Sequence, residues 1–151
     1  MKKIQGYCFC FLLAISLLSC STFSSSPPSA TQSGPRVLIL NGKQISEEDT
    51  GGFTSWYCKD YVYGGPVLVE VGFFGNLKYK GLGFILYDGG YTGELAHYQR
   101  VGLEHRWDWG PNENDYAFVI KPDGTGLYYD FSSAKKGQSI KARDVYKCYQ
   151  R

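Results

Sequence analysis

The chain has 151 residues, a length that predicts a single domain. Aromatic residues make up 17% of it and charged residues 20%, a composition that excludes a coiled coil and an acidic disordered protein. Lys2 and Lys3 account for the formal net charge of +2, because the remaining 14 basic residues equal the 14 acidic ones in number. This balance argues against a nucleic-acid-binding protein, whose surface is dominantly basic.

The N-terminus has the pattern of an export signal. Lys2 and Lys3 precede an almost wholly apolar run of 12 residues, 7–18, which is too short to cross a bilayer core of about 30 Å. A basic start, a short apolar stretch and a small residue before the break are typical of a signal peptide rather than a membrane anchor. We therefore predict a signal peptide over residues 1–19.

The end of this segment, Leu17-Leu18-Ser19-Cys20, resembles the lipobox of bacterial lipoproteins. The resemblance implies cleavage after Ser19, a diacylglycerol thioether on Cys20 and acylation of the new amino terminus, and several acyl chains anchor a protein stably in a membrane. Ser21 stands where Asp commonly keeps a lipoprotein at the inner membrane, so it favours the outer membrane. The expected location is the outer membrane, facing the periplasm or the cell surface. An ordinary signal peptide with a chance Cys is the alternative.

Residues 20–35 are rich in Ser, Thr and Pro and carry no charge. Phe23 is their one large apolar side chain, so they cannot bury enough surface to offset the entropy lost on ordering. We expect a flexible tether that extends to at most about 50 Å. One folded domain is expected to follow over residues 36–151.

Short runs of alternating apolar and polar residues in this domain predict β-strands separated by turns. The expected strands cover 37–40, 56–63, 67–74, 82–86, 103–109, 116–121, 127–131 and 145–149. The expected turns lie at 41–42, 64–66, 75–76, 88–90 and 122–126. Residues 93–98 could begin a short helix, although Gly102 and the surrounding aromatic residues favour strands.

Seven to eight short strands without a convincing amphipathic helix predict an all-β fold, a small antiparallel barrel or sandwich. The clearest element is a hairpin over residues 116–131. Pro122 presets one dihedral of its turn, and Gly124 and Gly126 can adopt positive φ without a Cβ penalty.

The cysteines predict one disulfide. Of the five, Cys8 and Cys10 leave with the signal peptide and Cys20 takes the lipid. Cys58 and Cys148 remain, and such a pair in an exported domain is most simply a disulfide that closes the β domain. The alternative is two separate buried thiols, whereas a redox role is disfavoured because the chain has no Cys-x-x-Cys pair.

Carboxylates and histidines form one cluster in the sequence: Glu94, His97, Glu104 and His105. A hairpin could assemble them into a metal site, but the His-Glu-x-x-His spacing is missing. In a strand, the neighbouring residues Glu104 and His105 would also point to opposite faces. Loop carboxylates could supply the pair that a glycosidase needs, although turns carry such residues anyway. These are Asp108, Glu113, Asp115 and Asp123. We expect no metal, no cofactor and no enzymatic activity, with an envelope hydrolase as an alternative.

The aromatic residues favour a binding surface. Tyr57, Tyr61 and Tyr63 share one face of a predicted strand. Together with Trp107 and other aromatic residues, they are more rings than a small core can easily bury. Tyr and Trp bind partners with little loss of side-chain entropy. The alternative is that these rings fill a barrel or pair across strands.

The C-terminal segment, 135–151, holds six basic residues and one acid, Asp144. Such a local positive patch suits anionic lipid, lipopolysaccharide or an acidic partner. The alternative is a solvated strand edge that discourages pairing with other chains.

One further motif, Thr125-Gly126-Leu127-Tyr128-Tyr129, is similar to the Ser-Gly-x-x-Tyr motif of bacterial membrane-bound inhibitors of c-type lysozyme, with Thr in place of Ser. Lys135, Lys136 and Gly137 follow it. Those inhibitors are lipoproteins with a small antiparallel barrel and a disulfide between early and late strands. The resemblance implies that the Thr125 loop, with Gly126 and Tyr128, enters the cleft of a lysozyme.

Together these patterns predict an outer-membrane lipoprotein, held by the lipid on Cys20, that displays a non-catalytic β domain. Its expected partner is a protein or an envelope polymer. The first alternative is an inhibitor of lysozyme or another cell-wall hydrolase, and the second is an envelope hydrolase.

Overall fold

The computed structural model describes residues 34–135 and 137–150. The predicted signal peptide, the lipid-attachment residue Cys20 and nearly all of the predicted tether lie outside these ranges. Within the described part of the chain, no helix has both the length and the apolar character needed to cross a membrane.

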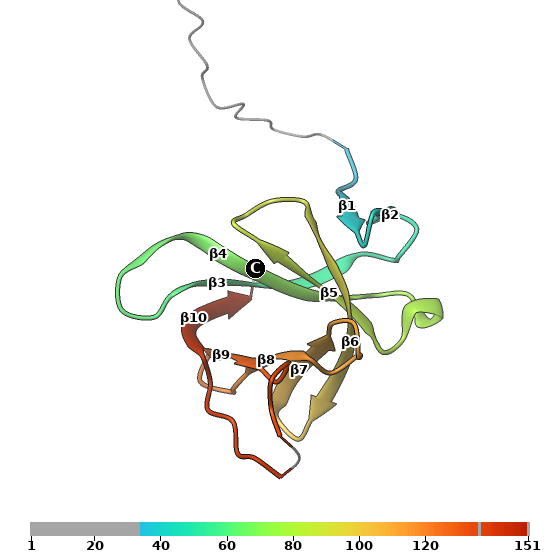
Figure 1. The fold of residues 1–151 in the computed structure, drawn as a ribbon. Helices are drawn as coiled ribbons and strands as arrows, with labels where there is room; N and C mark the ends of the chain where they lie inside the picture. Colours follow the sequence, from blue (N-terminus) through green and yellow to red (C-terminus); the bar gives the residue numbers. More distant parts are fainter. Residues whose placement is uncertain (1–33, 136, 151) are drawn as a thin grey trace, which may run out of the picture. The chain divides into compact units, whose positions relative to one another are not determined.

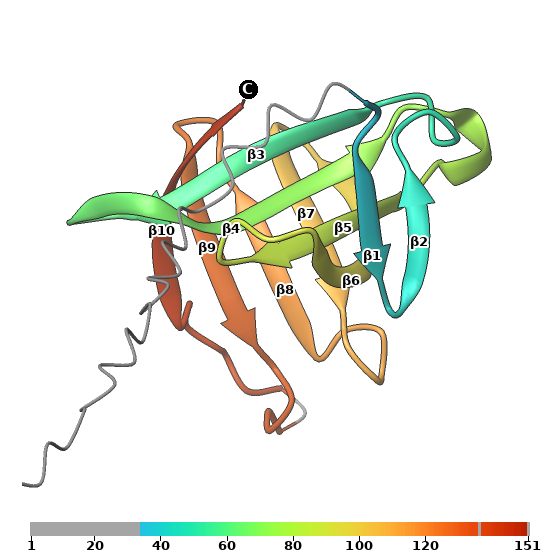
Figure 2. The same cartoon turned by 90° about the horizontal axis from the view of Figure 1, so that it is seen from above.

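Eight consecutive strands form a closed antiparallel barrel (Figures 1 and 2). They are β3 Phe53–Asp60, β4 Gly64–Phe74, β5 Leu82–Tyr87, β6 Thr92–Val101, β7 Glu104–Trp109, β8 Tyr116–Ile120, β9 Thr125–Asp130 and β10 Asp144–Gln150. Each strand pairs with the next along the chain, and β10 returns to pair with β3. The predicted all-β fold is confirmed, and it is the barrel rather than the sandwich.

Alternation along the strands directs one set of side chains into the barrel. The buried interior consists of Trp56, Cys58, Val69, Val71, Ile85, Ala96, Trp107, Trp109, Phe118, Ile120 and Cys148. Trp107 is fully buried, and its indole Nε1–H donates a 2.7 Å hydrogen bond to the carbonyl oxygen of Gly72. The aromatic residues therefore fill much of the barrel, as the alternative interpretation of the sequence allowed.

Two further strands, β1 Val37–Leu40 and β2 Lys43–Ser46, form a hairpin against the outside of the barrel (Figure 2). β1 pairs in parallel with the start of β6. Leu38 and Leu40 pack on Phe74, Phe84 and Leu86, which point outward from the barrel wall, and these residues form a second core. The predicted turn at Asn41-Gly42 is confirmed, with both residues at positive φ. Strand β2 is absent from the sequence prediction.

Several predicted elements differ from the structure, and three of the differences affect the ends of strands near the candidate site. The strand predicted to reach Tyr63 ends at Asp60, because the Asp60 carboxylate accepts hydrogen bonds from the backbone N–H groups of Val62 and Tyr63 and so forms a turn. The break predicted at residues 64–66 lies inside β4, which bulges where it pairs with the end of β3. Residues 93–98 belong to β6 and not to a helix.

The hairpin predicted over residues 116–131 is confirmed as β8 and β9. Gly124 in its turn has a φ of +82°, as a non-strained turn requires. Gly126 does not have positive φ, so its role differs from the predicted one. It lies in β9, opposite Ile120.

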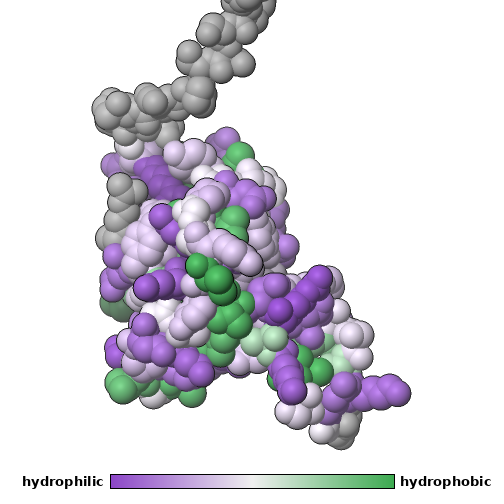
Figure 3. All heavy atoms as spheres, turned by 90° about the vertical axis from the view of Figure 1, so that its left-hand side faces the viewer, coloured by the Kyte–Doolittle hydropathy of each residue, from purple (hydrophilic) through white to green (hydrophobic). Residues whose placement is uncertain are grey.

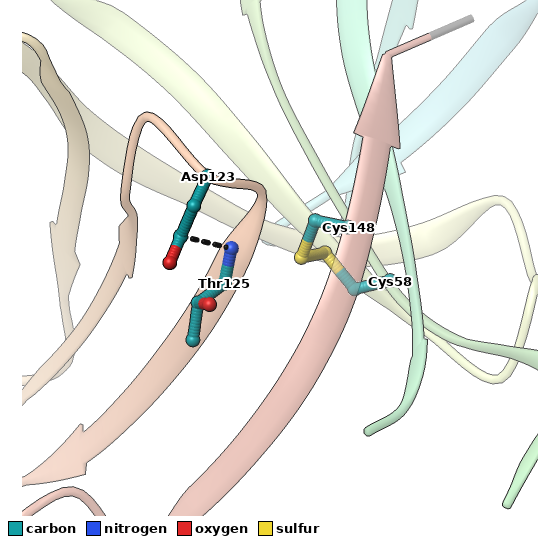
Figure 4. The surroundings of a disulfide bond; sticks show 4 residues. All are labelled: Cys58, Asp123, Thr125 and Cys148. Carbon is teal, nitrogen blue, oxygen red and sulfur yellow. Dashed lines mark hydrogen bonds between the residues drawn. A yellow bond between two sulfur atoms is a disulfide. The ribbon is translucent and has the colours of Figure 1, made fainter. Parts of the chain in front are cut away.

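The predicted disulfide joins Cys58 to Cys148, which stand directly opposite each other where β3 meets β10 (Figure 4). This is the seam at which the barrel closes. The disulfide therefore covalently links the first and last strands of the barrel, across 90 positions of sequence.

The barrel has two ends. We call the mouth the end formed by the β3–β4, β5–β6, β7–β8 and β9–β10 connections, and the base the end formed by the β4–β5, β6–β7 and β8–β9 connections. The base also holds the start of β3 and the end of β10, because Trp56 pairs with Gln150 there.

Candidate functional site

The predicted lysozyme-inhibitor motif does not form one surface. Thr125 lies half-buried at the base, where its backbone N–H donates a 2.9 Å hydrogen bond to the Asp123 carboxylate (Figure 4). Gly126 is buried beside the disulfide: a Cβ there would lie 2.5 Å from Cys148 Sγ and 3.0 Å from the Phe118 ring. Tyr128 lies further along β9 towards the mouth. Close packing thus explains Gly126, and of the three only Thr125, the first residue of β9, lies next to the β8–β9 turn.

The predicted tyrosine stripe divides between two environments. Tyr57 is half-buried on the outer face of β3, where its ring stacks on Tyr149 at a centroid distance of 6.0 Å. Tyr61 and Tyr63 lie in the β3–β4 turn with 52% and 89% of their surfaces exposed. On the side towards which this turn projects, a small group of hydrophobic side chains is surrounded by hydrophilic ones (Figure 3). Trp107 is a core residue and presents no surface to a partner.

The carboxylate–histidine cluster is not assembled. His97 is exposed on the outside of β6, whereas His105 packs among aromatic rings near the base, 4.4 Å from Trp56 between ring centroids. His105 Nδ1 also shares a 2.8 Å hydrogen bond with the Tyr98 hydroxyl, and burial lowers its pKa. The described residues contain no group of three or more side chains placed to hold a metal ion.

A cavity of about 500 Å³ opens at the mouth. Its lining residues are Leu68, Val69, Ile85, Tyr87, Asp88, Phe118, Tyr128, Arg143, Asp144 and Tyr146. Val69, Ile85 and Phe118 belong to the barrel core, so they form its apolar floor. Tyrosines and charged residues form its sides and rim. A smaller cavity, of about 360 Å³, opens at the base beside Trp56 and His105. The mouth thus holds the larger of these two openings, and ligands commonly enter a β-barrel at such an opening.

The tyrosine hydroxyls at the mouth lie in a field of carboxylates. Burial raises the pKa of Tyr87 well above its usual value, and the charge of Glu94 adds to the shift. Burial also raises the pKa of Tyr128 and of Tyr146, with further contributions from Asp130 and Asp144 respectively. These phenols are neutral at physiological pH and can donate or accept hydrogen bonds.

A second cavity, of about 750 Å³, lies beside the mouth, between β6 and the β7–β8 connection. It exists because the pairing of β6 with β7 starts only at His97 and Asp108, which leaves the first half of β6 without a β7 partner. Glu94 lines this gap, and its charge also reaches Tyr87 in the mouth cavity. Glu94 thus lies in the wall between the two cavities.

No sequence pattern marks Tyr87, Tyr146 or Asp144 as a binding residue. Tyr87 immediately precedes the predicted turn at 88–90, and Asp144 and Tyr146 share one face of the closing strand. Tyr and Asp at strand ends are a weak signal by themselves. Only barrel closure brings β5, β9 and β10 around one opening.

No known protein family, no curated protein and no solved structure matches this chain.

Proposed function

We propose that this chain is an outer-membrane lipoprotein whose β-barrel is a non-catalytic binding domain, and that its ligand enters the mouth cavity. The mouth cavity is the observation that supports the binding role. At about 500 Å³ it lies within the usual range of ligand sites of roughly 300–1,000 Å³. It combines an apolar floor with hydroxyl and charged groups at the rim, the arrangement that gives both affinity and orientation. A protein side chain or the end of an envelope polymer is of suitable size.

The location in the envelope rests on the lipobox-like segment and the predicted tether. Cys20→Ala should leave the chain unprocessed or release it from membranes, whereas Thr22→Ala should not. Membrane fractionation with mass analysis of the mature N-terminus measures both effects. Normal processing and full membrane retention of the Cys20→Ala variant would contradict the lipid anchor.

The binding proposal is tested by site-specific photo-crosslinking in intact cells. A benzoylphenylalanine in place of Tyr87 probes the mouth, and one in place of Leu103, which is 68% exposed at the base, is the matched control. We expect a discrete envelope adduct from position 87 and none from position 103. Adducts from the base alone would place the binding surface at the other end of the barrel and contradict the proposal.

A second candidate is an inhibitor of c-type lysozyme. It is favoured by the combination of a closed antiparallel barrel with a disulfide between its first and last strands, the architecture that the Thr125 motif resemblance implies. The purified domain should then slow c-type lysozyme at stoichiometric amounts. Thr125→Ala at the base should weaken inhibition more than Asn114→Ala at the mouth. Absence of inhibition at large excess would end this candidate.

A further inference from the structure

Four of the residues that line the mouth cavity are aromatic: Tyr87, Phe118, Tyr128 and Tyr146. Outside this lining, Trp109 and Tyr116 contact Tyr128, with ring centroids 6.0 and 6.3 Å from it. Tyr146 lies on the next strand, β10, with its ring 5.5 Å from that of Phe118. Tyr87 faces the same cavity from β5. Rings therefore line the opening on both sides of its floor.

The charges around the cavity are mostly negative. Asp88 and Asp144 line it directly, and the charges of Glu94 and Asp130 act on its tyrosines. Hydrogen bonds from Ser132 lower the pKa of Asp130, which keeps that carboxylate ionised.

Arg143 is the one basic residue among the described residues that line the cavity. Its guanidinium is paired with the Asp130 carboxylate at 3.0 Å. The charge of Arg143 also acts on Tyr128 and Tyr146, but this single cation stands against four carboxylates, those of Asp88, Glu94, Asp130 and Asp144.

We propose that the mouth cavity binds an organic cation, an amine or quaternary ammonium group carried by a small molecule or by the end of a polymer. This inference rests on the proposed function, since it assigns a ligand class to the same site. Aromatic faces attract such cations through their quadrupole, and the attraction grows as the cation loses water. Carboxylates at the rim add charge complementarity, while an anionic ligand would be repelled by them. The apolar floor accommodates the methyl or methylene groups that surround the charge.

The test compares a cation with its uncharged counterpart on the purified full chain in mild detergent. The probes are choline and 3,3-dimethyl-1-butanol, which has the same shape with carbon in place of the charged nitrogen. Proton NMR titration should show shifting and broadening of the choline N-methyl signal. We expect the neutral alcohol to bind at least tenfold more weakly, and added salt to weaken choline binding because part of the attraction is electrostatic.

Variants then locate the site. Tyr128→Leu and Asp144→Asn should each weaken choline binding by roughly three- to tenfold. Tyr149→Leu, on the outer face of β10, and Asp49→Asn, in the β2–β3 turn, are the matched controls and should bind as the unaltered chain does. Thermal melts of all four verify that any loss of binding is not a loss of fold.

The outcomes separate this inference from the proposed function. Equal binding of choline and the alcohol, both lost in Tyr128→Leu, would overturn the cation assignment and leave the mouth as the binding site. Absence of choline binding together with an envelope adduct from position 87 would also overturn the cation assignment and leave the mouth as the binding site. Choline binding unchanged in both mouth variants would overturn the cation assignment to this cavity, and a lack of any adduct from position 87 would overturn the proposed function.

Discussion

Removal of the Cys58–Cys148 disulfide should cost this domain a large part of its stability. The bridge closes a loop across 90 positions, and the chain-entropy relation gives about 4.6 kcal/mol at 25 °C for a loop of about that length. Replacing both cysteines by Ala also leaves a small void beside Gly126, which adds to the loss. We therefore expect the free energy of unfolding to fall by about 4–5 kcal/mol.

The barrel should nevertheless still form without the bridge. β10 pairs with β3 from Tyr146–Asp60 to Gln150–Trp56, and it pairs with β9 from Asp144–Tyr128 to Lys147–Thr125. These backbone ladders hold the seam in the folded state. The disulfide acts mainly on the unfolded chain by reducing its conformational freedom.

Urea unfolding of residues 34–151, followed by tryptophan fluorescence, measures the effect. With a urea dependence of about 2 kcal/mol per molar, the midpoint of the double Ala variant should lie about 2 M below that of the oxidised domain. Dithiothreitol should lower the midpoint of the unaltered domain similarly and leave the variant unchanged. A shift below about 0.5 M would show that the unfolded chain is not constrained as this relation assumes, and would refute the reasoning.

Three more predictions concern single side chains. Arg36→Ala should lower the free energy of unfolding by about 3 kcal/mol, because it leaves the buried Glu70 carboxylate without its ion pair. The double variant Arg36→Met, Glu70→Leu should lose less stability in the same urea assay, because no unpaired charge is left buried. Equal losses in the two variants would contradict this reasoning. Gly126→Ala should destabilise the domain by about 1–3 kcal/mol, since the new Cβ would crowd Cys148 Sγ, and an unchanged melting temperature would exclude that clash. The lowered pKa of His105 means that the unfolded chain binds more protons in mildly acidic solution. Stability should therefore be full above about pH 6.5 and fall as the pH drops through the lowered pKa, and His105→Phe should remove that part of the loss between pH 7.5 and 5.

Local patterns were sufficient for much of the fold. Alternation in residues 116–120 and a turn with Gly124 predict the β8–β9 hairpin, because period two suits a strand and positive φ suits glycine. The bridge between Cys58 and Cys148 is predicted because these are the two cysteines left in the domain once the signal peptide and the lipid-attachment residue are set aside. The lipid on Cys20, the tether and the outer-membrane location stay predictions, since residues 1–33 lie outside the described structure.

The candidate site was much less predictable. Tyr61 was expected within a strand, but an Asp60 side-chain hydrogen bond ends that strand, and nothing in the alternation signals it. Trp107 was expected at a surface, yet alternation says only which residues share a face and not whether that face points into a barrel. The sequence predicts that glycine is needed at position 126 for its backbone conformation. In the structure it is needed because a Cβ there would collide with the sulfur of Cys148.

The sequence by itself determined most of the strands and turns, because each depends on the chemistry of neighbouring residues, and it left Cys58 and Cys148 as the two cysteines of the β domain. Only the tertiary structure decided that the sheet closes through β10 and β3, that large rings fill the barrel core, and that a cavity opens at the mouth. Closure brings together strands from distant parts of the chain, so Tyr87 and Asp144 meet at one cavity although 57 positions separate them. Such proximity arises from hydrogen-bond register and side-chain volume around the whole barrel, and no local pattern of residues encodes it.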